Sequence, residues 1–225
     1  MIARKHTFMI TVKRFTFNPF QENTYVLHDE SGSCIIMDPG MEDRNEQEML
    51  VSYIDENELK PELVVNTHMH IDHILGNHFT TSHYRTQLAA HRDSLQFLER
   101  AAEQAQMFGI HLDEVREVDQ FLEEGSLLKF GNSSLEILHT PGHADGSLCF
   151  YSAGDRFVIV GDVLFNQSIG RTDLPTGDYE TLQKNIWEKL FTLPDDTVVY
   201  PGHGPETIIG YEKIHNPFVA IGKEK

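Results

Sequence analysis

The stretch from Val64 to His73 constrains this chain more than any other part of its sequence. An apolar segment that reads as a β-strand runs into four residues of metal-binding types within six positions: His68, His70, Asp72 and His73. Because alternate side chains of a strand share a face, His68, His70 and Asp72 would point together, while His73 turns away or continues into a loop. Imidazole and carboxylate suit zinc and related first-row ions, and four local donors exceed what one tetrahedral ion normally takes from such a cluster. We therefore predict two metal ions.

Three further candidate ligands follow strand-like segments, and each is preceded by glycine. They are His143, Asp162 and His203. Glycine lets the backbone turn tightly and approach other loops, so we expect these side chains to converge on one rim of the fold. Taken singly, each of these three residues would be a turn or capping residue, and the alternatives for the cluster at 68–73 are a structural zinc site or a polar loop. Structural zinc sites usually close on four ligands that include cysteine, whereas these seven donors divide into two ions that share one carboxylate and leave room for water.

The composition limits the partners and the compartment. The chain has 18 Lys and Arg against 35 Asp and Glu, a formal net charge of -17, which argues against nucleic acid and anionic membranes as partners. Cys34 and Cys149 lie in separate apolar segments, so we expect reduced thiols and a cytoplasmic location. No secretory signal and no apolar segment of about 20 residues is evident. The expected partner is a small-molecule substrate, and the oligomeric state is left open.

The hydrophobic pattern predicts an α+β fold. The length suits one domain, 1–225, with 1–8 as an extension or an alternative start. The predicted strands are 11–17, 24–27, 34–37, 63–66, 87–90, 121–122, 126–130, 134–139, 147–151, 157–160 and 198–200. The predicted helices are 42–57, a short helix after Asn77, 93–108 and 179–190. Two strand-rich halves with helices predict two packed sheets that are covered by helices on both outer faces.

The order and spacing of the motifs resemble the metallo-β-lactamase superfamily. The resemblance rests on Thr67 to His73, Gly142-His143, Gly161-Asp162 and Gly202-His203, and it covers nearly the whole chain. It implies the four-layer αββα sandwich of that fold and gives Asp38 a role in orienting ligands. It also implies the ligand sets: His68, His70 and His143 for the first metal, Asp72, His73 and His203 for the second, and Asp162 as the bridge.

Within the superfamily, the chain is similar to short bacterial hydrolases of the glyoxalase II type, which hydrolyse glutathione thioesters. The similar segments are 18–23, 170–175, 201–207 and 216–218. The longer hydroxyacylglutathione hydrolases add a C-terminal helical region that binds glutathione, and we expect this protein to lack it. Arg171 matches a basic glutathione contact of those enzymes, while Asp173 and Pro205 stand at positions that are aromatic there. We expect Arg171 to bind substrate or to form a salt bridge with Asp173 or Asp178.

The resemblance implies a metal-dependent hydrolase of a thioester such as S-lactoylglutathione. Two zinc ions, or iron or manganese, about 3.5 to 4 Å apart would lower the pKa of a bridging water toward about 7. Asp72 and Asp162 are the expected catalytic carboxylates, with Asp72 orienting the nucleophile and accepting a proton. The rival is a persulfide dioxygenase with a single iron, which the segment from Gly170 to Asp173 also resembles. A lactonase, a β-lactamase and a non-catalytic module rank behind these two.

Overall fold

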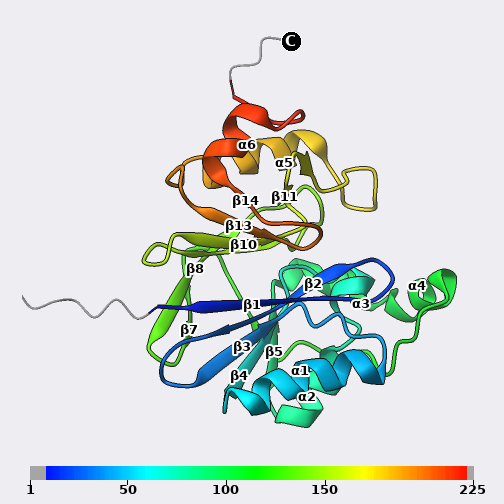
Figure 1. The fold of residues 1–225 in the computed structure, drawn as a ribbon. Helices are drawn as coiled ribbons and strands as arrows, with labels where there is room; N and C mark the ends of the chain where they lie inside the picture. The colour runs from blue at the N-terminus through cyan, green and yellow to red at the C-terminus, as the bar shows by residue number, and fades with distance from the viewer. Residues whose placement is uncertain (1–8, 222–225) are drawn as a thin grey trace, which may run out of the picture.

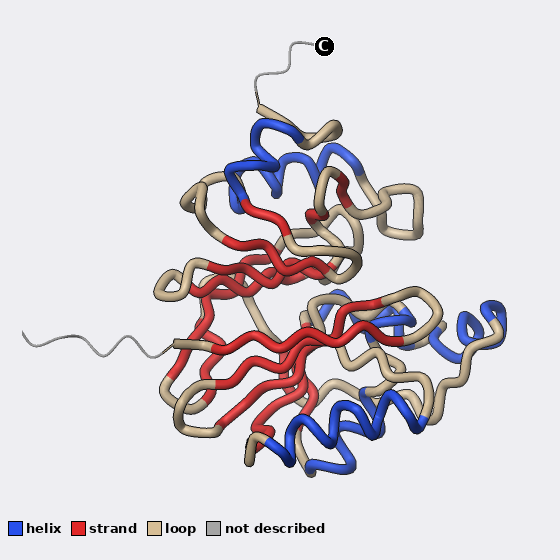
Figure 2. Tube along the Cα trace, viewed as in Figure 1, coloured by secondary structure: helices blue, strands red, loops and turns tan. Residues whose placement is uncertain are grey.

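The computed structural model describes residues 9–221, so the extension predicted at 1–8 lies outside the described residues. Two six-stranded sheets pack against each other, and helices cover the outer face of each (Figure 1). Figure 2 shows the strands in the middle of the molecule, with helices above and below them. The predicted α+β fold, a four-layer αββα sandwich, is confirmed.

The first sheet contains the N-terminal strands in the order β1-β2-β3-β4-β5-β6. Strands β1 to β3 are antiparallel, whereas β3 to β6 are parallel neighbours. Their bounds are β1 Thr11–Phe17, β2 Glu22–His28, β3 Ser33–Met37, β4 Lys60–Val65, β5 Gln87–Ala90 and β6 Gln120–Phe121.

The second sheet has the order β14-β13-β10-β9-β8-β7. Its strands are β7 Leu127–Phe130, β8 Ser133–His139, β9 Leu148–Ser152, β10 Phe157–Gly161, β13 Val198–Pro201 and β14 Thr207–Ile208. A small hairpin, β11 Leu164–Phe165 with β12 Ser168–Ile169, stands apart from both sheets. Because β8 and β10 are both antiparallel to β9, and β13 is parallel to β10, the carboxyl ends of β8, β10 and β13 lie at one edge.

The helices lie on the two outer faces and in the connections. The first sheet carries α1 Arg44–Glu56, α2 Asn77–Tyr84, α3 Leu95–Leu98 and α4 Ala101–Phe108, together with the 3₁₀ turns η1 Ile71–His73 and η2 Arg92–Ser94. The second sheet carries α5 Tyr179–Asn185, the π-helical turn η3 Ile186–Leu190 and α6 Ile209–His215. The Asp43 side chain caps α1 by accepting from the Glu46 N–H, and Asp178 caps α5 by accepting from the Thr181 N–H.

Side-chain alternation along the strands sorts the core into layers. On β4, Leu63 and Val65 pack between the two sheets, while Val64 packs beneath the helices of the outer face. A slip of one residue would exchange these faces, and burying each aliphatic side chain contributes roughly 1.5–3 kcal/mol. The register of β4 is therefore well fixed, and with it the place where the histidine-rich loop leaves the sheet.

The helices differ from the sequence predictions in three places. The helix predicted at 93–108 is divided into η2, α3 and α4, with a break at Arg100, whose N–H donates to the Phe97 carbonyl at 3.2 Å. The break lets Phe97, Ala101 and Ala105 pack into one apolar cluster. The helix predicted at 179–190 ends in the π-helical turn, and α6 was not predicted because its seven residues are too short to show a clear period.

Candidate metal centre

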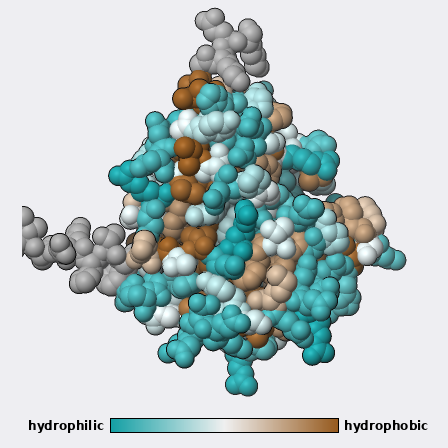
Figure 3. Space-filling model, in the orientation of Figure 1, coloured by the Kyte–Doolittle hydropathy of each residue, from teal (hydrophilic) through white to brown (hydrophobic). Residues whose placement is uncertain are grey.

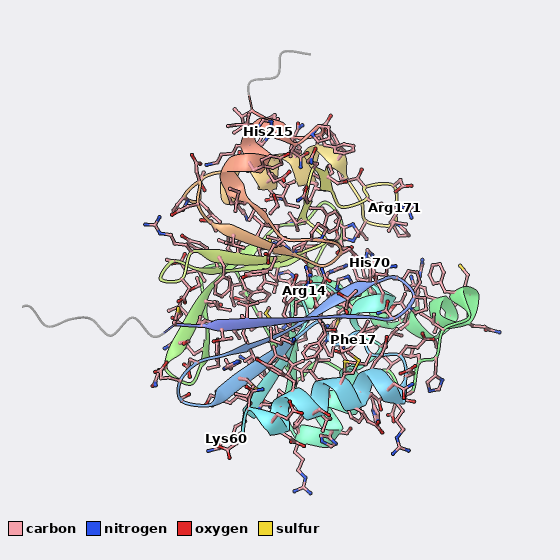
Figure 4. All side chains as sticks on the ribbon, viewed as in Figure 1. Arg14, Phe17, Lys60, His70, Arg171 and His215 are labelled. Atoms are coloured by element: carbon pink, nitrogen blue, oxygen red, sulfur yellow. The ribbon has the colours of Figure 1, made fainter. Side chains whose placement is uncertain are left out.

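The seven candidate ligands meet at the edge of the sandwich where β4, β8, β10 and β13 end. His68, His70, Asp72 and His73 follow β4, His143 follows β8, Asp162 follows β10 and His203 follows β13. Figure 4 shows His70 at the seam between the two sheets, close to one side of the molecule. The structure thus brings together every residue that the sequence assigned to the metal site.

The first donor group consists of His68, His70 and His143. The Nδ1 atom of His143 donates to the Arg171 carbonyl at 2.8 Å, so Nε2 is the ring nitrogen left to bind a cation, and it faces His70 Nδ1 at 2.9 Å. The Nε2 atom of His68 also faces His70 Nδ1, at 3.1 Å. Burial, reinforced by His143, lowers the pKa of His70 to about 3, and burial lowers the pKa of His68 well below its usual value. Three imidazole nitrogens that converge in this way form a site for a cation.

The second donor group consists of Asp72, His73 and His203. The Nε2 atom of His203 lies 3.1 Å from Asp72 Oδ2, and the Nε2 atom of His73 lies 3.7 Å from the same oxygen. The paired carboxylates Asp72 and Asp162 outweigh burial and hold the pKa of His73 above its usual value. The three donor atoms lie within 4.8 Å of one another.

Asp162 lies between the two groups. Its Oδ1 is 3.5 Å from His73 Nε2, and its Oδ2 is 3.5 Å from His203 Nε2 and 3.6 Å from His143 Nε2. Burial would raise the pKa of Asp162, but His73, His203 and His143 together outweigh it and lower the pKa well below the usual value. One carboxylate therefore faces both donor groups, which is the geometry of a bridging ligand.

Several buried polar atoms of the centre have no hydrogen-bond partner within the described residues. They include both ring nitrogens of His73 and Oδ1 of Asp162. Buried polar groups without partners are rare in folded proteins, because each costs about 1–3 kcal/mol. A metal ion bound among these atoms would supply the missing partner, so the donor set fits metal binding.

His73 lies in a loop, which is the second of the two predicted alternatives, and its side chain does not turn away from the centre. Strand β4 ends at Val65, and the 3₁₀ turn η1 follows the extended residue His70. The His73 N–H donates to the His70 carbonyl at 3.0 Å, and its own carbonyl accepts from Asn66 Nδ2 at 2.8 Å. Because the chain coils here instead of alternating, the His73 side chain turns inward and is fully buried. All four residues of the loop consequently reach the centre.

Asp38 supports the histidine-rich loop that follows β4 through buried contacts. Its carboxylate accepts from the Thr67 N–H at 2.7 Å and from the Thr67 hydroxyl at 2.6 Å, and its Oδ2 lies 3.1 Å from His73 Nδ1. Glu22 is also fully buried, with Oε1 3.9 Å from His73 Nδ1, and burial raises its pKa well above the usual value. These contacts hold the His73 ring in place and agree with the orienting role that the resemblance implied for Asp38.

The β1–β2 hairpin holds the turn that carries His203, and the sequence did not predict these contacts. Asn23 Nδ2 donates to the carbonyls of Pro201 at 3.0 Å and Gly204 at 2.9 Å, and the Tyr25 hydroxyl donates to the Pro201 carbonyl at 2.7 Å. The His203 Nδ1 atom donates to the Phe20 carbonyl at 3.1 Å. These contacts join segments about 180 positions apart, and no local pattern in the sequence signals them.

The His143 turn is packed tightly against α5. Gly142 has φ +127°, and a Cβ at this position would lie 2.3 Å from the Leu182 nitrogen. The Gly142 carbonyl accepts from the Asp178 N–H at 2.8 Å, and the Pro141 carbonyl accepts from Asn185 Nδ2 at 2.8 Å. Helix α5 therefore sets the position of His143.

Arg171 contributes its backbone to the centre and turns its side chain outward. Its carbonyl accepts from His143 Nδ1, while the guanidinium makes two bonds of 2.9 Å to the Asp173 carboxylate. Both side chains are about 70% exposed, at 68% and 71%. The structure thus contains the predicted salt bridge to Asp173, and a substrate contact by Arg171 stays a prediction.

A second cluster, His91, Asp93 and His139, has donor atoms within 4.8 Å of one another but is poorly arranged for a metal. The rings of His91 and His139 are stacked, with centroids 4.1 Å apart and an interplanar angle of 14°. Parallel rings at this spacing cannot both direct an in-plane lone pair at the same ion. We interpret this cluster as packing.

A profile of the metallo-beta-lactamase superfamily matches residues 17–203, which span the centre from the first hairpin to His203. The chain belongs to this superfamily. It is 39% identical over 202 residues to hydroxyacylglutathione hydrolase GloC of Haemophilus influenzae, a match that covers 89% of this chain and 93% of GloC.

Two solved structures are similar over nearly their whole length. The B3 metallo-beta-lactamase BLEG-1 superposes with a TM-score of 0.85 at 34% identity, covering 93% of this chain and 99% of BLEG-1. TTHA1623, which was solved in a di-iron-bound form, superposes with a TM-score of 0.82 at 34% identity, covering 92% of this chain and all of TTHA1623 (100%). Among residues 9–221, no helix has the length and apolar character needed to cross a membrane.

Proposed function

We propose that this protein is a dinuclear metal-dependent hydrolase of glutathione-type thioesters, with S-lactoylglutathione as the reference substrate. The observation that carries the proposal is the pair of donor groups with Asp162 between them. The substrate class is supported by the likeness to GloC, which is named a hydroxyacylglutathione hydrolase. A thioester is also a chemically suitable substrate, because its thiolate leaves with little need for protonation.

The ligands divide as the geometry of the two groups suggests. His68, His70 and His143 hold the first ion, Asp72, His73 and His203 hold the second, and Asp162 lies between them. We propose zinc for both ions, with iron or manganese as alternatives that the same donors accept. When bound, two such cations supply Lewis-acid activation of water and of the thioester carbonyl.

The protein side chains orient the donors and move a proton. Thr67 Oγ1 lies 3.1 Å from His68 Nδ1, and the Arg171 carbonyl fixes His143, so both Nε2 atoms stay turned toward the centre. As the water oxygen bonds to the acyl carbon and the carbon–sulfur bond breaks, Asp72 accepts the proton of the water and releases it to solvent or to the departing thiolate. The Asp72 side chain is 14% exposed, so this proton has a route out of the site.

Hydrolysis of S-lactoylglutathione tests the proposal. Protein that is stripped of metal and reloaded with zinc or, under anaerobic conditions, with iron is assayed together with its metal content. We expect turnover at two ions per chain and its loss in Asp72→Ala and Asp162→Ala, with less bound metal in Asp162→Ala. Asp196→Ala is the matched control, because Asp196 is exposed and pairs with Arg156 away from the centre. Full activity at one ion per chain would refute the dinuclear arrangement.

The same preparations separate the rival activities. Hydrolysis of a chromogenic β-lactam, without thioester turnover, would replace the proposal with the activity that BLEG-1 is named for. Oxygen uptake on glutathione persulfide in the iron form alone would replace it with a dioxygenase. A metal-loaded protein that acts on none of these compounds would refute the thioesterase.

A further inference from the structure

An exposed apolar surface stands at the mouth of the metal centre. We call it the apolar wall and define it as Phe20, Met107 and Phe108. Phe20 belongs to the turn between β1 and β2, and the other two end α4. The rings of Phe20 and Phe108 meet edge to face with centroids 5.4 Å apart, so the two segments touch. Figure 3 shows brown-toned side chains gathered over α4 at the right-hand edge of the molecule.

The apolar wall is continuous with the metal centre at two places. The Phe20 carbonyl accepts from His203 Nδ1 at 3.1 Å, so the wall begins at the residue that holds one proposed ligand. Helix α4 packs against η1, the turn that carries Asp72 and His73. In α3, the buried ring of Phe97 packs edge to face with the ring of His70, with centroids 4.8 Å apart. The wall is therefore carried by segments that contact the metal centre directly.

The side chains of the wall are far more exposed than packing requires. Phe20, Phe108 and Met107 are 37%, 53% and 71% exposed, in a chain with a formal net charge of -17. A contiguous exposed apolar patch beside a binding site commonly marks a ligand contact. The cation expected to bind a carboxylate of the substrate, Arg171, is already bound by Asp173. The mouth thus offers apolar contact, while this cation is already paired.

We propose that the apolar wall binds an apolar acyl group of the thioester, so that this enzyme prefers larger acyl groups to lactoyl. The proposal rests on the proposed thioesterase function. It assigns Phe108 and Met107 as specificity-determining residues, and it assigns Phe20 both a backbone role at His203 and a side-chain role in the wall.

Two series of compounds with one thiol carrier test this inference. S-acylglutathiones from acetyl to octanoyl report turnover, and the non-hydrolysable S-alkylglutathiones from methyl to octyl report binding by calorimetry. We expect kcat/KM and affinity to rise roughly threefold to fourfold per buried methylene until the wall is covered. Phe108→Ala and Met107→Ala should each reduce the rise of kcat/KM and of affinity with chain length, while Phe108→Leu should keep most of that rise. Phe218→Ala is the matched control, because Phe218 is 50% exposed and belongs to the C-terminal segment.

The outcomes decide between the two proposals. Turnover that does not depend on acyl length overturns the apolar wall and leaves the thioesterase standing. No turnover, together with alkyl affinity that rises with length and falls in Phe108→Ala, refutes the thioesterase and keeps the wall as an apolar binding surface. No length dependence in either series overturns the inference. A dimer that sedimentation detects in the wild type and not in Phe108→Ala would show that a second copy covers the wall, which also overturns it.

Discussion

Gly142→Ala should damage both the fold and the metal centre. At φ +127° an alanine is strained by about 1–3 kcal/mol. Its Cβ would also lie 2.3 Å from the Leu182 nitrogen and 2.5 Å from the Leu182 Cα, an overlap with backbone that costs about 1–3 kcal/mol more. We therefore expect the free energy of unfolding to fall by roughly 2–6 kcal/mol, the sum of the two terms. Because α5 must shift, His143 should move and weaken the first donor group.

Urea unfolding, followed by circular dichroism in the presence of a chelator, measures the loss without any contribution from metal. Gly125→Ala is the control, since Gly125 also has a positive φ, +78°, but has no atom within 4 Å of an added Cβ. Its free energy of unfolding should fall by only about 1–2 kcal/mol, the cost of placing alanine in the left-handed backbone region. Equal losses in the two variants, or unchanged zinc stoichiometry in Gly142→Ala, would refute the close-packing argument.

Three further predictions follow from other contacts. Asp29→Asn should lower the free energy of unfolding at pH 7 by about 1–3 kcal/mol, because hydroxyls of Ser31 and Ser133 donate to this buried carboxylate. These bonds outweigh burial and hold the pKa of Asp29 below its usual 3.8, so the stabilisation is present above that pH and is lost as the pH falls through the lower folded value. Urea unfolding from pH 7 to 2 checks this, and a difference from wild type that does not change with pH would contradict it. Thr67→Val should cost about 1–3 kcal/mol in the same assay, since Asp38 loses a buried donor; a neutral effect would mean that Asp38 is satisfied elsewhere. Zinc at 100 times its Kd should add about 2.7 kcal/mol and raise Tm by roughly 5–10 °C over chelator-treated protein, and an unchanged Tm would argue against binding.

Much of the fold was predictable because strand and ligand signals are local. Strands β1 and β5 have the predicted bounds, and the glycine before Asp162 marked a real turn with a positive φ. The convergence of all seven donors was also predictable, since each follows a strand and three of the strands share a direction.

The remaining features depend on contacts between distant segments. The inward turn of His73 is set by Asn66 and by a 3₁₀ turn, neither of which a period-2 pattern reveals. Asn23 and Tyr25 read as ordinary strand residues, yet they bind the turn that carries His203. Residues 93–108 form separate short helices because they pack on β4 and β5. This packing overrides the continuous helical periodicity of the sequence.

The placement of the donors has a consequence for how the centre is assembled during synthesis. The first donor group has all of its residues once residue 143 has been made and its support from α5 once residue 185 has been made. The second needs residue 203 and the hairpin near the amino terminus that secures it. A growing chain can thus present one complete ion-binding group before the other. We expect the two proposed ions to bind in a fixed order. The last one would bind where the hairpin near the amino terminus meets the turn that carries His203.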